Sequence, residues 1–292
     1  MPIEPRESGV LYVVATPIGN LDDISARARS VLAGVDAIAA EDTRHTGRLL
    51  ASLGVSTPLI ALHEHTESER AAAVLDRVAA GESIALVSDA GTPLISDPGY
   101  RLVALARERC LRVVAIPGSC AAIAALSVAG LPTDRFRFEG FLPARSAARR
   151  ARLELIRNAA ETLVFYEAVH RIGEMLADLA AVLGAGRRAC VLREMTKLHE
   201  SAYIGTLAEI ASQRMQDAGG DRGEFTLVVA GAVVAAPADE ELARVVAILA
   251  AELPPAQAAA LAARITGGER RAAYRLALES RGPTSGALQD GD

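Results

Sequence analysis

Short apolar runs alternate with helix-type patterns through the first half of the chain, and this alternation restricts the possible folds more than any other feature of the sequence. The runs that predict strands are Val10–Ala15, Ala37–Ala40, Leu59–Leu62, Ile84–Val87 and Val113–Ile116. Helical patterns lie between them, most clearly at Glu67–Ala80 and Gly99–Arg109. Strands that are apolar along their whole length and separated by helices are typical of a parallel sheet with both faces covered. We therefore expect an α/β domain with a parallel sheet.

A second set of elements begins near Phe136. Its predicted strands are Thr162–Tyr166, Ala189–Leu192, Ala202–Ile204 and Phe225–Val234. Its predicted helices are Ala147–Asn158, Arg171–Leu183 and Leu207–Gln216. Beyond Pro237 only helical patterns remain, at Glu240–Glu252, Pro255–Ile265 and Glu269–Glu279.

These patterns predict an α/β protein built from several domains. An N-terminal α/β domain with the parallel sheet spans residues 10–132, a second α/β domain spans 133–236, and a small helical domain spans 237–281. The tail, 282–292, combines Gly, Ser, Thr and Pro with acidic residues and is expected to be disordered. Asp22 or Asp23 is expected to cap the first helix, which Gly34 ends.

Uncommon loops follow the predicted strands, at the place where open α/β sheets bind their ligands. The loop around Pro17 and Gly19 is rigid and small, but it lacks the GxGxxG spacing of a dinucleotide site. The stretch 88–99 holds two glycines, two prolines and two aspartates, which is too elaborate for an ordinary connector. There, Asp89 is placed to face a cation or a ribose hydroxyl, whereas Asp97 precedes Pro98 and is expected to cap the next helix.

Two further loops of this half have competing interpretations. In the stretch Glu41–His45, Asp42 or Thr43 caps a helix with the charges solvated, or a carboxylate and an imidazole lie near a reacting hydroxyl. The small residues of 118–122 either leave room for a ligand against helix amides or pack the helix tightly on the sheet. Cys120 has no basic partner nearby and is expected to be a small buried thiol rather than a nucleophile.

In the second set of elements, residues 165–171 and 192–200 each place a glutamate and basic side chains just after a strand. Surface charge is the default interpretation of either cluster. Because the two clusters occupy equivalent positions, together they favour a polar cleft.

The formal net charge of −5 and the isoelectric point of about 5.7 mean that any nucleic-acid binding depends on local basic patches. Five arginines in and around one helix form such a patch: Arg145, Arg149, Arg150, Arg152 and Arg157. A solvated helix face is the alternative interpretation.

Other features concern location and metals. Three widely spaced cysteines and the absence of a secretory signal lead us to expect a cytoplasmic protein. The long uncharged stretch Val113–Thr133 is interrupted at Pro117 and Gly118, so a strand, a turn and a helix are expected rather than a membrane span. His63 and His65 would point to opposite sides of an extended strand, so no metal site is expected.

Several of these stretches resemble one family. YVVATPIGNLDDIS, AEDTRHTGRLL, ALHEHTE, VSDAGTPLISDPGY, IPGSCAAIAAL, GFLPARSAARR, FYEAVHRI, LREMTKLHE and GEFTLVVAG together resemble the RsmI-type ribosomal RNA ribose methyltransferases of the tetrapyrrole methylase superfamily. The resemblance runs from about Leu11 to Gly231, and the last helices are similar to the small C-terminal helical domain of that family.

The resemblance implies two α/β domains that enclose a cleft for S-adenosylmethionine, and a homodimer. It implies 2′-O-methylation of a cytidine in the decoding region of small-subunit ribosomal RNA, cytidine 1402 by analogy. The residues that it places against the cofactor are Pro17, Gly19, Asp89, Ala90, Gly91, Thr92, Ile95, Ser119, Cys120, Ala121, Ala122, Tyr166, Glu194, Met195, Phe225 and Thr226.

Methyl transfer from a sulfonium is a direct displacement, so neither a covalent enzyme intermediate nor a metal is required. A ribose hydroxyl is a poor nucleophile until its proton is accepted, and one general base contributes roughly 10²–10⁴-fold. The candidates are Glu41, Asp42, His45, Asp89 and Glu167, or Lys197 if burial keeps it neutral. The sequence does not choose among them.

Two rival functions share this fold. A methylase that acts on a precorrin-like ring would use the same cofactor without needing the arginine-rich helix. A non-enzymatic RNA-binding assembly factor would need no cofactor. A dinucleotide-dependent oxidoreductase is disfavoured because the phosphate-loop spacing is missing.

Overall fold

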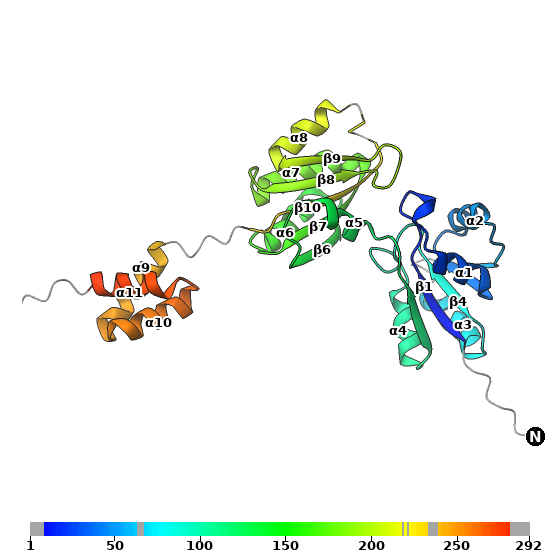
Figure 1. The fold of residues 1–292 in the computed structure, drawn as a ribbon, viewed down its shortest axis with the longest axis horizontal. Coiled ribbons are helices and arrows are strands. Elements are labelled where there is room, and N and C mark those ends of the chain that lie inside the picture. The colour runs from blue at the N-terminus through cyan, green and yellow to red at the C-terminus, as the bar shows by residue number, and fades with distance from the viewer. Residues whose placement is uncertain (1–8, 63–66, 218, 221, 233–238, 281–292) are drawn as a thin grey trace, which may run out of the picture. The chain divides into compact units, whose positions relative to one another are not determined.

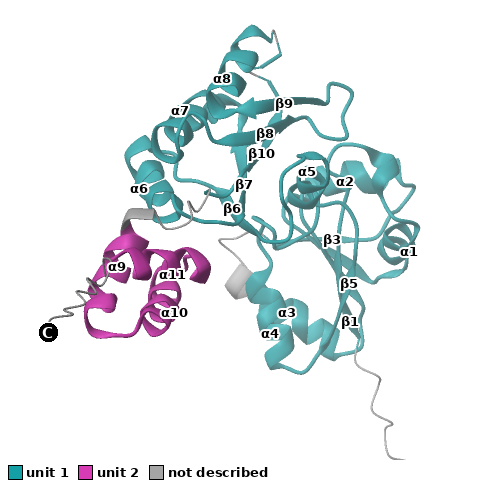
Figure 2. Ribbon diagram, turned by 60° about the vertical axis from the view of Figure 1, so that its left-hand side comes forward, with its two compact units in different colours: residues 1–232 teal, residues 233–292 magenta. Residues whose placement is uncertain are grey.

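The computed structural model describes residues 9–62, 67–217, 219–220, 222–232 and 239–280. The chain divides into two compact units, Met1–Ala232 and Val233–Asp292, which Figure 2 colours separately. The histidines at 63 and 65 and the tail 282–292 lie outside the described residues.

Unit 1 contains a parallel sheet in the order β3-β2-β4-β1-β5, of which Figure 1 labels β1 and β4. Its strands are β1 Val10–Val14, β2 Ala37–Ala40, β3 Leu59–Ala61, β4 Ile84–Val87 and β5 Arg112–Ile116. Successive residues of β4 pack against different helices, because side chains along a strand alternate between the faces. Ile84 and Leu86 join the cluster of the helices 67–79 and 100–108, whereas Ala85 and Val87 join that of the helices 26–34 and 43–52. The predicted parallel sheet, apolar on both faces, is confirmed.

The helices of this half are α1 Ala26–Gly34, α2 Thr43–Ser52, α3 Glu67–Ala79 and α4 Tyr100–Glu108. The predicted cap of α1 is wrong. Asp22 and Asp23 belong to a short 3₁₀ turn, Leu21–Asp23, and the extended Ile24 separates this turn from the helix. Ser25 caps α1 instead, because its Oγ accepts the Ala28 N–H at 3.0 Å.

The second sheet of unit 1 has the order β6-β7-β10-β8-β9. Its strands are β6 Phe136–Phe141, β7 Thr162–Ala168, β8 Arg188–Arg193, β9 Ser201–Thr206 and β10 Glu224–Val229. Only the β6–β7 pair is parallel. The edge strand β6 was not predicted, because Arg137, Glu139 and Gly140 interrupt its apolar pattern. The strand predicted at Phe225–Val234 ends at Val229.

Helices cover both faces of this sheet. Ala122, Ala125 and Leu126 of α5 (Ala121–Val128) pack on Val164, Cys190, Leu192 and Val228. Helices α6 Ser146–Ile156, α7 Ile172–Leu183 and α8 Leu207–Gln216 contribute to the core on the other face. The uncharged stretch after Val113 is therefore a strand, a turn and a helix, as predicted. No helix in the described part of the chain is long and apolar enough to cross a membrane.

Unit 2 is a bundle of α9 Asp239–Glu252, α10 Pro255–Thr266 and α11 Arg270–Glu279. Its core is built mainly from alanine: Leu242, Val246, Ala250, Ala258, Ala259, Ala262, Ala273 and Ala277. Because alanine is small, the helices approach closely. Gly267, at φ +71°, makes the left-handed turn that ends α10.

Candidate functional site

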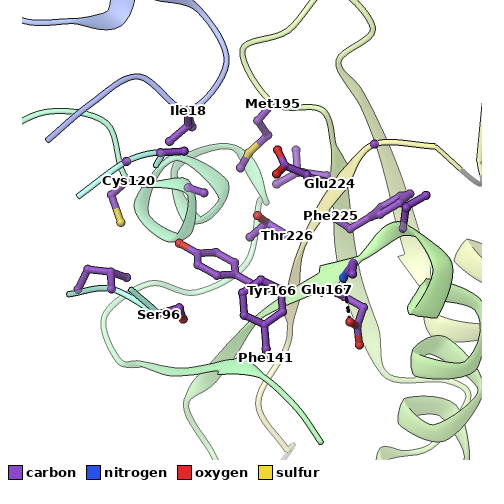
Figure 3. Close-up of a pocket in the computed structure, with 18 of the residues that line it drawn as sticks. Ile18, Ser96, Cys120, Phe141, Tyr166, Glu167, Met195, Glu224, Phe225 and Thr226 are labelled. Atoms are coloured by element: carbon purple, nitrogen blue, oxygen red, sulfur yellow. Dashed lines mark hydrogen bonds between the residues drawn. The ribbon is translucent and has the colours of Figure 1, made fainter. Parts of the chain in front are cut away.

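A cavity of about 450 Å³ lies where the ends of strands from both sheets of unit 1 meet (Figure 3). The first sheet contributes the loops that follow β1, β4 and β5. The second sheet contributes the ends of β6, β7 and β8 and the start of β10. Parallel α/β sheets bind ligands outside the carboxyl ends of their strands, so this is the expected position for a site.

Many residues predicted to touch the cofactor line this cavity: Ala90, Gly91, Thr92, Ile95, Cys120, Ala121, Tyr166, Met195, Phe225 and Thr226. The predicted residues outside the lining are Pro17, Gly19, Asp89, Ser119, Ala122 and Glu194. These lie beside lining residues in the chain or contact them. Cys120, expected to be buried, is half-buried at the cavity wall.

The loops of the first sheet are tied together at the cavity. Thr16 and Gly91 exchange backbone hydrogen bonds of 2.8 and 3.1 Å, and Thr92 Oγ1 donates to the Ser119 carbonyl at 2.9 Å. Gly91 has φ +80°, and a Cβ there would lie 3.2 Å from Ile18 Cγ2. The position therefore favours glycine in both conformation and space.

Tyr166 joins the second sheet to the start of α5, the helix that follows β5 in the chain. Its hydroxyl accepts the Ala122 N–H at 3.0 Å, in the first turn of α5. Figure 3 shows this hydroxyl directed toward the segment that carries Cys120. Phe138 and Phe141 hold the ring edge-on, with centroids 5.0 and 5.6 Å away. Burial raises the pKa of Tyr166, so the phenol stays protonated at neutral pH.

The loop after β8 is held by charged side chains. Arg193 is 8% exposed and donates to Ser201 Oγ at 3.1 Å and to the His199 and Gly219 carbonyls. Lys197 Nζ lies 2.8 Å from Glu194 Oε1 and 2.7 Å from Glu224 Oε2.

The protonation of Lys197 follows from these ion pairs. Burial acts to lower its pKa, but the pairs with Glu194 and Glu224 outweigh burial and raise it. Lys197 lines the cavity as a cation, so the condition under which it was a candidate base is not met.

Three carboxylates line the cavity, and they differ in their partners. Glu224 is paired with Lys197. Glu167 is 2% exposed; its Oε1 accepts the Ala168 N–H at 2.8 Å and lies 3.1 Å from Arg171 Nε. Within the described residues, Glu167 Oε2 is buried and has no hydrogen-bond partner.

Asp97 is the third lining carboxylate, and the prediction that it caps the next helix is wrong. Gly99, not Asp97, occupies the N-cap of α4, and no side chain caps that helix. Burial raises the pKa of Asp97 to about 6, and the negative charge of Asp89 adds to this while a hydrogen bond with Ser88 opposes it. Leu94 and Ser96 adopt φ +74° and +67° just before it, which marks a constrained loop. This combination of non-glycine residues at positive φ cannot be read from the sequence.

The acidic cluster after β2 lies outside the lining. Asp42 caps α2 by accepting the Arg44 N–H at 2.7 Å and the His45 N–H at 3.3 Å, and these bonds lower its pKa. Asp89 Oδ1 accepts the Asp42 N–H at 3.1 Å. Neither Glu41 nor His45 lines the cavity.

The arginine-rich helix α6 is largely occupied by internal ion pairs. Arg149 is fully buried, with Nε 2.7 Å from Asp178 Oδ2 and Nη2 3.3 Å from Glu174 Oε2. Its guanidinium has no exposed face for a phosphate, which removes it from the predicted RNA patch. Arg150, Arg152 and Arg157 pair with Asp178, Glu139 and Glu154, at 3.2, 2.8 and 3.7 Å.

The cavity fits a ligand that is partly apolar and positively charged. Ile18, Ile95, Phe141 and Met195 offer apolar surface, while the lining carboxylates outnumber the lining lysine. Both properties suit S-adenosylmethionine, which joins an adenosine to a sulfonium. Among the described residues, no group of three or more His, Cys, Asp or Glu side chains is arranged to hold a metal.

Comparison with known proteins agrees with this architecture. The family described as Tetrapyrrole (Corrin/Porphyrin) Methylases matches residues 10–211, and the RsmI C-terminal HTH domain matches residues 236–281. A uroporphyrin-III C-methyl transferase from Thermus thermophilus, solved in complex with S-adenyl homocysteine, superposes with a TM-score of 0.52 at 19% identity. The match covers 77% of this chain and 98% of that one. At this identity the likeness shows the fold alone.

Two relatives are much more similar in sequence. The Ribosomal RNA small subunit methyltransferase I of Xylella fastidiosa is 52% identical over 272 residues, 91% of this chain and 98% of the relative. The protein of the same name from Pseudomonas aeruginosa is 52% identical over 280 residues, 94% of this chain and 99% of the relative.

Two joined α/β halves with a cavity at their strand ends define the tetrapyrrole methylase class of proteins. Within this class, the chain belongs to the RsmI-type family of ribosomal RNA small subunit methyltransferases.

Proposed function

We propose that this protein transfers a methyl group from S-adenosylmethionine to the ribose 2′-hydroxyl of a decoding-region cytidine in small-subunit ribosomal RNA. The observation that carries the proposal is 52% identity, over nearly the full length, to relatives named for methylation of that RNA. The composition of the cavity supports the cofactor. The proposal extends to a homodimer that works in the cytoplasm.

The cofactor would lie against the interlocked loops of the first sheet. Gly91 and Thr92 offer backbone without bulk, while Ile95 and Met195 offer apolar surface. The buried Glu167 Oε2 would accept a hydrogen bond from a ligand group, which removes the cost of an unsatisfied buried acceptor. When bound, S-adenosylmethionine supplies a methyl group on a positively charged sulfur.

Asp97 is the proton acceptor in this proposal. A carboxylate paired with a cation is a weaker base, because the cation stabilises the ionised form. Glu167 and Glu224 have such partners, in Arg171 and Lys197. Asp97 makes no ion pair within the described residues, and its pKa of about 6 suits proton transfer near neutral pH. It would hold the proton of the acceptor hydroxyl on its carboxylate.

Methylation of purified small subunits with radiolabelled S-adenosylmethionine tests the function. A ribose 2′-O-methyl group blocks alkaline cleavage of the following phosphodiester, so the label should appear in an alkali-resistant dinucleotide that begins with cytidine. Label in a nucleobase, or at another nucleoside, would contradict the proposal. Calorimetric titration with S-adenosylmethionine separates an enzyme from an assembly factor, which need not bind the cofactor.

The role of Asp97 has its own test. Asp97→Asn should lower kcat by roughly 10²-fold or more while cofactor affinity stays within about twofold. Asp134→Asn is the matched control, because Asp134 is exposed and does not line the cavity. A weakened cofactor affinity with unchanged kcat would make Asp97 a cofactor-binding residue instead.

A further inference from the structure

An acidic chain that binds RNA needs a cationic surface, and α6 offers less of one than its sequence suggests. The net charge is −5, and the arginines at 149, 150, 152 and 157 all face carboxylates. Of the five arginines in and around α6, only Arg145, just before the helix, is exposed and makes no ion pair with another described residue. Phosphate contacts supply most of the nonspecific affinity for RNA, so other arginines must be considered.

Helix α11 of unit 2 carries a compact group of arginines on one face. Ala273 and Ala277 are fully buried and turn one side of the helix into the core. Arg270, Arg271 and Arg275 are exposed, and so is Tyr274, at 44%. The spacing i, i+1, i+4 and i+5 places these four side chains together, because residues three to four apart share a helix face.

These guanidiniums differ from those of α6 in having no ion-pair partner among the described residues. Within the described residues, the arginines at 270, 271 and 275 make no ion pair, whereas Arg244 on α9 pairs with Glu241 at 3.8 Å. Arg264, in the last turn of α10, is also exposed and adds a further positive charge close by in the chain.

We propose that the face formed by Arg270, Arg271, Tyr274 and Arg275 binds the sugar–phosphate backbone of the RNA substrate. Arginine presents a planar fork that pairs with phosphate oxygens in two parallel hydrogen bonds. An exposed tyrosine among arginines offers a ring on which an unpaired base stacks. This inference rests on the proposed function, which supplies RNA as the class of ligand. The α11 face contributes to the affinity for RNA and takes no part in the methyl-transfer step.

Arginine contacts to phosphate make the affinity for RNA depend on salt concentration, and the steepness of this dependence reports the number of contacts. Each phosphate neutralised contributes about 0.7–0.9 to the slope of log affinity against log salt concentration. Loss of three contacts should therefore reduce that slope by about two to three. The loss should be similar for unrelated RNA sequences, because phosphates carry no sequence information.

The test uses the full chain with Arg270→Gln, Arg271→Gln and Arg275→Gln combined. The matched control combines Arg107→Gln, Arg112→Gln and Arg244→Gln, which removes the same charge from exposed positions on α4, β5 and α9. Fluorescence anisotropy measures binding to a labelled transcript of the decoding region, to an unrelated RNA of equal length, and to intact small subunits, over a range of salt.

The α11 variant should bind both transcripts at least about tenfold more weakly with a reduced salt slope, while the control stays within about threefold of wild type. Equal losses in the two variants would mean that only net charge matters and would overturn the inference. A loss for intact subunits but not for naked RNA would overturn it in favour of a protein partner.

The proposed function is checked separately. Calorimetry should show unchanged affinity for S-adenosylmethionine, and methyl transfer at saturating subunits should keep its kcat while KM rises. If wild type methylates subunits and the α11 variant has the same KM, this inference fails while the proposed function stands. If wild type transfers no methyl group, the proposed function fails whatever α11 does.

Discussion

Helices α6 and α11 are both rich in arginine, yet the structure places their arginines in opposite surroundings. Arg149 of α6 is fully buried between Asp178 and Glu174, and its neighbours pair with other carboxylates. The arginines of α11 are exposed, with no ion pair among the described residues. The number of arginines in a segment therefore does not measure its free positive charge.

The difference arises from what each helix packs against. The apolar positions of α6 contact a sheet core, and the adjacent helix α7 brings Asp178 and Glu174 to its arginines. The buried side of α11 meets an alanine core that carries no charge. Arg149 thus joins α6 to α7, whereas the α11 arginines are free to meet a ligand.

The largest predicted effect concerns Arg149. Arg149→Met should lower the free energy of unfolding by about 3–5 kcal/mol, because it leaves Asp178 charged, mostly buried and without its main partner. Urea denaturation measures the change. The double substitution Arg149→Met with Asp178→Leu should recover part of the loss, since the charges that lose a partner, on Arg150 and Glu174, are exposed and no buried unpaired charge remains. If Arg149→Met were as stable as wild type, the contrast between the two helices would be wrong, because the packing of α6 would then not depend on the Arg149–Asp178 ion pair.

The pH dependence should separate affinity from rate. Arginine does not titrate below pH 12, so the charge of the α11 arginines is constant between pH 5 and 8. Their contribution to RNA affinity should therefore not change over this range. Asp97 must be ionised to accept a proton, and its pKa is about 6. The methyl-transfer rate should therefore fall as the pH drops through 6. At pH 5 it should be roughly a tenth of its value at high pH, a difference of about 1.4 kcal/mol in activation free energy. Rate and anisotropy measurements over this range test both statements.

Asp97→Asn should abolish the fall in the methyl-transfer rate below pH 6, which is the acid limb of the pH profile. The other titratable groups that line the cavity or lie near Asp97 are Asp89, Cys120, Tyr166, Glu167, His170, Lys197 and Glu224. If the limb persists in the variant, one of these groups controls it. The variant should fold at least as well as wild type above pH 6, because a raised carboxyl pKa means that folding disfavours the ionised form there.

A smaller effect is expected at Tyr274. Tyr274→Ala should weaken binding of single-stranded RNA by about 1 kcal/mol, roughly fivefold, through loss of a stacking surface. Tyr274→Phe keeps the ring and should bind like wild type. If wild type and both Tyr274 variants bind RNA equally in anisotropy measurements, the tyrosine ring makes no contribution and only the arginines of the α11 face bind RNA.

The smallest effect is expected on α6. Arg145→Gln, Arg150→Gln and Arg157→Gln combined should weaken RNA binding less than about threefold, because two of these three charges are already paired. An effect as large as that of the α11 variant would show that the RNA competes successfully for these ion pairs, and the distinction between the two helices would disappear.

The sequence determined most of the secondary structure and the region of the site. Uninterrupted apolar strands specified the parallel sheet, and the uncommon loops after β1, β4 and β5 lie at the cavity. The hydrophobic pattern did not predict a strand where polar residues or a β-bulge interrupt it. The edge strand β6 is such a case, with its register shift between Phe138 and Gly140.

Only the tertiary structure decided which charges remain free. The sequence shows Arg149, Asp97 and Lys197 as similar polar residues near strand ends or on a helix. Folding buries Arg149 against Asp178, pairs Lys197 with Glu224, and leaves Asp97 partly buried without a cation among the described residues. The partners are 29 and 27 residues away in the chain, so local pattern does not reveal them. Burial and distant partners set the charge state of a side chain, and both exist only once the chain has folded.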